Sequence, residues 1–481
     1  MKIRIQSLVV VSFVLFAFAL QPIAEAVVPR PDGGYPGANT AEGENALLSL
    51  TTGTFNTAVG FFALKNNDLG NYNTAVGAGA LFGNNESVAN TAVGAGTLLL
   101  NTGGADNTAN GAFALLHNQF GSENTAIGAF ALQDNVDGSS NTAVGGSALS
   151  ANTEGDSNTA VGSSALSGNT AGFENTAIGA GALSFNEEGG ENTAVGVDAA
   201  HFSTAGSFNT AVGHSAFALG TGEDNTAIGY QALSNNSGLQ NTAVGSGALP
   251  GNASGISNTA LGCGALINSS SGSNNSAFGD FAGSNVTTAS NVICIGSDGA
   301  DVSNTTWVGN IYGVTTQSGT TAPVIVSEDG QLGTLASSER FKRDIADMEE
   351  ATEAILASRP VTFHYKSDTK DAPQFGLIAE EVANVNPALV LPDQEGKPYT
   401  VRYEAVNAML LNEFLKEHRR VEELKSAIAQ QRKDFEAALS RQQKATDALV
   451  ARLNEQERQI QRVGARIETR KSDMEMLVDN Q

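Results

Sequence analysis

The chain has 481 residues, a formal net charge of −24 and two cysteines. Lys65 is the only basic residue between Arg30 and Arg340, so this acidic stretch lacks the cations that bind phosphates, and nucleic acid is excluded as its partner. The five histidines and the cysteines show no metal-ligand spacing, and we expect no metal and no cofactor.

Residues 1–26 have the pattern of a signal peptide. Lys2 and Arg4 supply a charged start, an apolar run follows, and small residues at 24–26 form a cleavage site. The run is shorter than the ~20 residues that span a bilayer. The sequence therefore predicts an exported chain, secreted or at the cell surface, without a membrane span after signal removal. A linker at 27–38 follows.

Residues 39–312 form a repeat array. Sixteen copies of about 17 residues begin with an asparagine, from Asn39 to Asn291, and fourteen of them open Asn-Thr-Ala. In fifteen copies a glycine stands four residues after the asparagine. Because this period has no room for a helix and a strand, each repeat is predicted to be one coil of a β-solenoid rod.

Within a coil, Asn-Thr-Ala-Val-Gly predicts a short strand, and an Ala-Leu pair such as Ala63-Leu64 predicts part of a second strand. The polar stretch 65–70 predicts a solvent-facing loop. Stacked asparagines should form a ladder of side-chain hydrogen bonds from coil to coil. Since each coil offers few apolar side chains, we expect one face of the rod to be buried against another chain. Cys263 and Cys294 are expected to be buried.

The Ala-Val-Gly and Ala-Ile-Gly sequences of residues 39–296 resemble the head repeats of trimeric autotransporter adhesins. The resemblance implies a homotrimer in which three chains form a left-handed parallel β-roll. The period here is longer than in that family, and no membrane-inserted β-barrel follows. Self-translocation and covalent anchoring are therefore not implied.

After Asn291 the repeat loosens, and Trp307-Val308-Gly309 predicts a degraded final turn. Residues 313–336, rich in Gly, Thr and Ser, are predicted to be a neck. At Ser337 charged residues return. A helix with Met348 and Ile355 is expected next.

The rest of the region 337–424 is predicted to complete a small α+β unit. A strand is expected at 361–365 and a strand leading into a helix at 374–382, and further segments follow at 387–390 and 400–403.

This order of segments resembles the intramolecular chaperone domain of phage endosialidases, other tailspikes and tail fibres. The resemblance covers 337–424 and implies a domain that trimerises, holds three chains in register and then cuts itself off. Ser337 and Lys342 occupy the positions of the family's Ser-Lys dyad, with Ser337 as nucleophile and Lys342 as base. Arg340 is the neighbouring cation that would favour a neutral lysine.

The family places aspartate after the serine, where this chain has Ser338. Ser338 is therefore an alternative nucleophile, or the change slows or abolishes cleavage. A reading without catalysis is that Ser337 and Ser338 cap a helix that begins near Arg340, with Glu339 at its positive end.

Residues 404–480 are predicted to be a coiled coil. Mostly apolar residues recur every seven positions in two series that are offset by four residues, a stutter that locally unwinds the supercoil. The first series is Val421, Ile428, Phe435, Gln442 and Leu449, and the second is Leu453, Ile460, Ile467 and Met474.

The sequence thus predicts a mainly β, exported, homotrimeric fibre with a chaperone domain and a coiled coil. Its partners would be its own copies and a receptor on a host surface, matrix or glycan. The alternatives are a glycan-active enzyme on the rod, which needs two carboxylates in a shaped site, and a non-cleaving surface-coat fibre. Catalysis would otherwise be limited to a single self-cleavage beside Ser337, without an external substrate.

Overall fold

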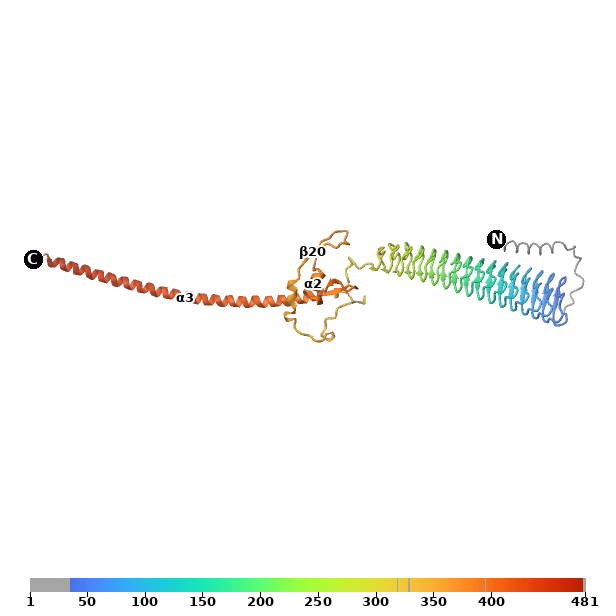
Figure 1. Cartoon of the computed structure of the whole chain (residues 1–481), viewed down its shortest axis with the longest axis horizontal. Helices are drawn as coiled ribbons and strands as arrows, with labels where there is room; N and C mark the ends of the chain where they lie inside the picture. The colour runs from blue at the N-terminus through green and yellow to red at the C-terminus, as the bar shows by residue number, and fades with distance from the viewer. Residues whose placement is uncertain (1–34, 318, 328, 394, 479–481) are drawn as a thin grey trace. The chain divides into compact units, whose positions relative to one another are not determined.

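The computed structural model describes residues 35–317, 319–327, 329–393 and 395–478. The predicted signal peptide and most of the linker lie outside the described residues. The chain divides into two compact units, Met1–Gly319 and Thr320–Gln481. Figure 1 shows the stacked coils of the first unit and the long helix α3 of the second.

The first unit is a parallel β-solenoid, as the repeat predicted. Its strands stack in one sheet, and each pairs with the strand of the next coil at equivalent residues, for example Thr57 with Thr74 and Val59 with Val76. The seventeen strands are β1 (Thr40–Glu42), β2 (Thr57–Val59), β3 (Thr74–Val76), β4 (Thr91–Val93), β5 (Thr108–Asn110), β6 (Thr125–Ile127), β7 (Thr142–Val144), β8 (Thr159–Val161), β9 (Thr176–Ile178), β10 (Thr193–Val195), β11 (Thr210–Val212), β12 (Thr226–Ile228), β13 (Thr242–Val244), β14 (Thr259–Leu261), β15 (Ser276–Phe278), β16 (Val292–Ile295) and β17 (Thr305–Val308).

Each coil has one strand, so the second strand predicted at the Ala-Leu pair is wrong. Leu64 has a φ of 49°, and its equivalents share this left-handed conformation, which belongs to a turn. The coil must close within 17 residues, and this turn closes it. The pair still stacks, because the backbone N–H of Leu64 donates to the carbonyl of Ala80 at 3.0 Å. Ala63 and Leu64 are fully buried in the narrow core.

The predicted asparagine ladder is present. The backbone N–H of Asn56 donates to Oδ1 of Asn39 at 2.9 Å, and Nδ2 of Asn56 donates to the carbonyl of Gly70 at 2.8 Å. The ladder ends where the N–H of Val292 donates to Oδ1 of Asn275 at 2.9 Å. Val292, not Asn291, therefore continues the stack, which explains why the repeat loosens there.

A second asparagine ladder was not predicted. Asn67, expected in a solvent-facing loop, is fully buried, and Nδ2 of Asn84 donates to its Oδ1 at 2.6 Å. The series is Asn67, Asn84, Asn101, Asn118, Asn135, Asn152, Asn169 and Asn186. It breaks at Ser203, where the Ser203 Oγ and the Asn186 Oδ1 are buried without a hydrogen-bond partner among the described residues.

The end of the solenoid is closed by a carboxylate. In the first coil the backbone N–H groups of residues 51–53 converge on the carbonyl of Asp68 in the next coil. At the end of the rod Oδ1 of Asp301 accepts the equivalent bonds from residues 287–289, at 2.7 to 2.9 Å. Hydrogen bonds from Thr287, first its hydroxyl, hold the pKa of Asp301 well below its usual range. Asp301 thus replaces a carbonyl of the next coil.

The degraded final turn is confirmed, because Trp307 of β17 pairs with Cys294 of β16. Cys294 is buried as expected, and burial, followed by the nearby Asp298, raises its thiol pKa. Cys263 is exposed, so that part of the prediction was wrong. The cause is its position just after the strand and its glycine, where the chain turns outward.

The second unit contains small sheets and helices. A hairpin in the predicted neck is formed by β18 (Ile325–Val326) and β19 (Leu332–Gly333). The other elements are the 3₁₀ helices η1 (Glu339–Phe341), η2 (Glu349–Ala357) and η3 (Pro387–Leu389), the strands β20 (Val361–Phe363), β21 (Gln374–Gly376), β22 (Val390–Pro392) and β23 (Pro398–Val401), and the helices α2 (Ala379–Val385) and α3 (Tyr403–Val478). The predicted order is confirmed, although the first helix is 3₁₀.

The second ladder can be tested by a reciprocal exchange. Asn135→Ser should lower the free energy of unfolding, because it removes the Nδ2 donor to Asn118 at 2.7 Å and the acceptor of Asn152. Ser203→Asn should raise the free energy of unfolding, because an amide there can satisfy Asn186. Each change should be about 1 kcal/mol per chain. Thermal unfolding midpoints measure both, and shifts of the same sign would contradict the ladder.

The second prediction concerns the carboxylate of Asp301 at the end of the rod. Its folded pKa lies below the unfolded value of about 3.9, so its stabilisation is present above that pH and is lost only as pH falls through the folded value. Asp301→Ala should therefore speed amide hydrogen exchange of residues 287–289 at pH 7. Asp137→Ala, in an exposed loop, is the control. Equal exchange in both variants would contradict the role of Asp301.

Candidate functional site

The candidate cleavage residues lie on a short turn in the second unit, after the hairpin of β18 and β19. Ser338 precedes η1, and the turn is closed by backbone bonds from the N–H of Phe341 to Ser338 and from the N–H of Lys342 to Glu339, at 3.0 and 2.8 Å. The Ser338 side chain makes no capping hydrogen bond. The predicted role of this hydroxyl as a helix cap is therefore wrong, since the backbone alone closes the turn.

The single chain does not assemble the predicted dyad. Ser337, Ser338, Arg340 and Lys342 are all exposed, and no hydrogen bond joins either serine to Lys342 in this described segment. A nucleophile and its base need hydrogen-bond reach, although the contact is often looser before the reacting state forms. The turn presents both groups to solvent.

Arg340 does not approach Lys342 through a polar contact. Its guanidinium lies 4.7 Å from the centre of the Phe341 ring. Phe341 and Ile345 remain 63% and 64% exposed. Apolar side chains in and just after the turn are therefore exposed to solvent, close in sequence to the candidate serines and Lys342.

The unit behind the turn has a small core that rests on the start of α3. Its buried residues are Ile355, Val382, Leu389, Val401, Val406 and Met409. The guanidinium of Arg359 forms two hydrogen bonds with the carboxylate of Glu381 on α2, and the bond from Arg359 lowers the pKa of Glu381. The hydroxyl of Tyr403 accepts from the N–H of Leu377 at 3.1 Å.

A polar cluster that the sequence analysis missed fixes η2 to α3. Thr352 is fully buried, and its hydroxyl bonds to the carboxylate of Glu413 and accepts from Asn412 at 2.9 Å. Lys416 donates to Glu413 at 2.8 Å, and this bond, followed by that from Thr352, lowers the pKa of Glu413. The i, i+4 spacing of Asn412 and Lys416 places them on one helix face, but no sequence signal links them to Thr352.

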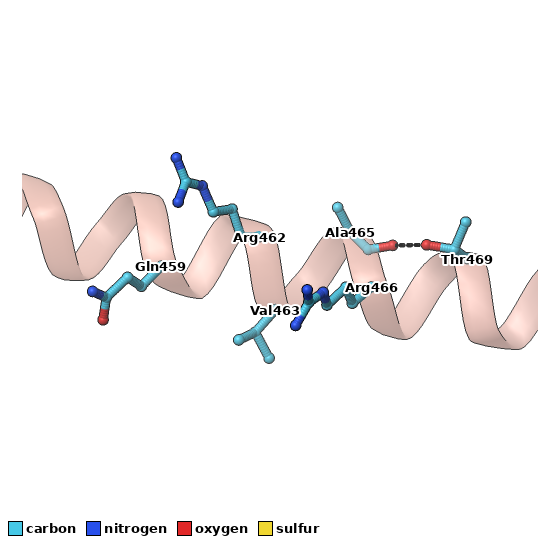
Figure 2. A pocket seen from close by; sticks show the side chains of 6 residues that line it. All are labelled: Gln459, Arg462, Val463, Ala465, Arg466 and Thr469. Atoms are coloured by element: carbon cyan, nitrogen blue, oxygen red, sulfur yellow. Dashed lines mark hydrogen bonds between the residues drawn. The ribbon is translucent and has the colours of Figure 1, made fainter.

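Helix α3 presents its predicted heptad residues to solvent. Val421, Ile428 and Phe435 are exposed, as are the residues of the second series. Figure 2 shows a shallow hollow at 459–469 in which Gln459, Arg462, Val463, Ala465, Arg466 and Thr469 all project from this one helix. A hollow on one helix encloses no small molecule, so the surface suits contact with another helix.

No helix in the described residues has an apolar stretch long enough to cross a membrane. No group of three or more His, Cys, Asp or Glu side chains in the same residues is arranged to hold a metal ion.

Comparison with known families bears on the region after the rod. Residues 337–391 match the family model for the chaperone of endosialidase. The match begins at Ser337, where the predicted resemblance begins, and it follows the β-solenoid. This combination fits a tailspike-like or fibre-like protein. No curated protein and no solved structure matches the chain. The resemblance of the repeats to adhesin heads stays a prediction.

The Thr352 cluster yields a test of this unit. Thr352→Val keeps the shape of the side chain but removes the hydroxyl that bonds to Asn412 and Glu413, so it should cost about 1–3 kcal/mol in the unfolding free energy of this unit. Thr362→Val, on an exposed strand position, is the control. Denaturant unfolding of the full chain measures the effect, and equal stability of the two variants would contradict it.

Proposed function

We propose that the protein is an exported homotrimeric fibre whose region 337–424 is an intramolecular chaperone that aligns three copies of the rod. The observation that carries this proposal is a long solenoid of nearly identical coils that is followed, after the neck, by a segment matching the chaperone of endosialidase family. Adhesion to a host surface, matrix or glycan, or coating of a surface, is the proposed use of the fibre.

The repetition of the rod supplies the reason for a chaperone. Every interior coil pairs equivalent residues with the next coil. If copies of such a rod pack side by side, a shift by one coil loses only the contacts of the end coils. The free-energy difference between correct and shifted assemblies is therefore small, and alignment has to be set elsewhere.

The exposed heptad residues of α3 provide that alignment in the proposal. A helix of 76 residues whose apolar positions lie in solvent needs partner helices to bury them. Three parallel copies would begin their solenoids at the same residue. The cluster around Thr352 then connects the helix to η2 and so to the segment that carries Ser337.

Self-cleavage is the second part of the proposal. The Ser337 hydroxyl gives its proton to the Lys342 amine and attacks the carbonyl of the preceding residue. The peptide C–N bond before Ser337 then breaks, and the proton returns to the leaving amine of Ser337. Water hydrolyses the resulting ester on the Ser337 oxygen. Lys342 needs a less polar environment for this role. Packing of the exposed Phe341 and Ile345 against other copies would supply it.

The test is expression of residues 27–481, followed by native and denaturing mass measurement. We expect a trimer and a fragment of 145 residues that begins at Ser337, with the fragment absent in Ser337→Ala and Lys342→Ala. Ser338→Ala distinguishes the alternative nucleophile, and Ser358→Ala is the control.

A full-length trimer without cleavage would reject the dyad and keep the chaperone role, which is the outcome expected of a non-cleaving coat fibre. A full-length monomer would reject the assembly. Release of sugars from a polysaccharide by the purified rod would favour the glycan-active alternative.

A further inference from the structure

The strands of the solenoid carry an exposed apolar column. In each three-residue strand the middle residue faces the core, as Ala58 does in β2, while the third faces outward. Val59 remains 38% exposed. We call the last residues of strands β2 to β17 the valine column, which comprises Val59, Val76, Val93, Asn110, Ile127, Val144, Val161, Ile178, Val195, Val212, Ile228, Val244, Leu261, Phe278, Ile295 and Val308.

The register of the sheet makes this column continuous. Val59 pairs with Val76, Val76 with Val93, and the pairing continues to Ile295 and Val308. Adjacent members are one strand spacing apart, about 4.8 Å. An apolar strip that runs the length of a rod is larger than the patches that single soluble chains normally leave in water.

Charge separates this face from the rest of the rod. From β2 to β17 no member of the valine column is charged, and the residues two positions earlier, which share its face, are Thr, Ser or Ile. The acidic residues, such as Glu154 and Glu187, lie in loops instead. A second copy of this acidic chain would meet like charges there, whereas the strand face from β2 to β17 offers none, because Glu42 lies in β1.

Asn110 is the one polar member of the column. It stands between Val93 and Ile127 in the sheet, and its exposed side chain forms no hydrogen bond with the rest of the described chain. A carboxamide carries both donors and an acceptor, so copies of the same amide can pair with one another. A lone polar residue in an apolar contact can specify register at some cost in stability.

We propose that the valine column is the surface on which copies of this chain pack, and that Asn110 amides pair between the copies and so favour the register that the region after the rod sets. The inference rests on the proposed trimer and adds which face of the rod is buried. We expect the valine column to be covered by copies of this chain, because they have the same coil spacing, the same acidic loops and an Asn110 amide that can pair with itself.

Chemical cross-linking tests the face. In full-length chain carrying Cys263→Ser and Cys294→Ala, which match residues at the equivalent positions of other coils, a single cysteine is placed at Val161 or at Ala171. Both positions are exposed and belong to one coil, but Ala171 lies in the loop. A short thiol cross-linker should join chains at least tenfold more at position 161.

The native mass of each sample is measured first, so that two failures can be distinguished. A trimer with equal or absent cross-linking at position 161 would overturn the proposed face and leave the fibre proposal intact. A monomer would overturn both.

The pairing of Asn110 amides is tested by introducing a charged side chain at this position. Asn110→Asp should lower the melting midpoint of the full-length trimer by several degrees at pH 7, because it brings like charges together at the interface. Asn85→Asp, in an exposed loop two coils earlier, should leave the midpoint unchanged. Equal midpoints in the two variants would overturn the pairing of Asn110 amides.

Discussion

Everything in the rod depends on each coil completing the hydrogen bonds of its neighbour. The side-chain amide of an asparagine such as Asn56 accepts a hydrogen bond from the backbone N–H of Asn73 and donates one to the carbonyl of Gly70. The side chain thus forms hydrogen bonds with the backbone of the next coil, as a neighbouring strand would. An unpaired buried polar group costs roughly 1–3 kcal/mol, which makes the spacing of coils strict. The same constraint explains Asp301, which supplies the acceptor that a further coil would have supplied.

This constraint creates the problem that the second unit is proposed to solve. Coils that satisfy one another in the same way are interchangeable, so the rod contains little information about where its copies should align. The buried Ser203 in the second ladder and Asn110 on the outer face are rare departures from an otherwise uniform repeat. The helix α3, with its varied heptad residues, carries far more positional information.

Much of the fold could be predicted because the repeat is periodic: a fixed period required stacked coils, and the heptads required a long helix. The turn at Leu64 could not be predicted, since its left-handed backbone follows from closure of the coil and not from leucine itself. Asn67 was misread because turn-rich composition does not reveal which amide points inward. The cleavage residues were predicted by resemblance alone, and their contacts depend on packing that one sequence does not contain.

The role proposed for the region after the rod is to align the copies of the rod. The most direct measurement is the refolding yield of native trimer, by sedimentation velocity, for residues 27–481 and for residues 27–336 at equal concentration. We expect the full chain to return to a single trimeric species and the shortened chain to give monomers and heterogeneous aggregates. Equal yields of the same trimer from both would contradict a role of residues 337–481 in aligning the copies.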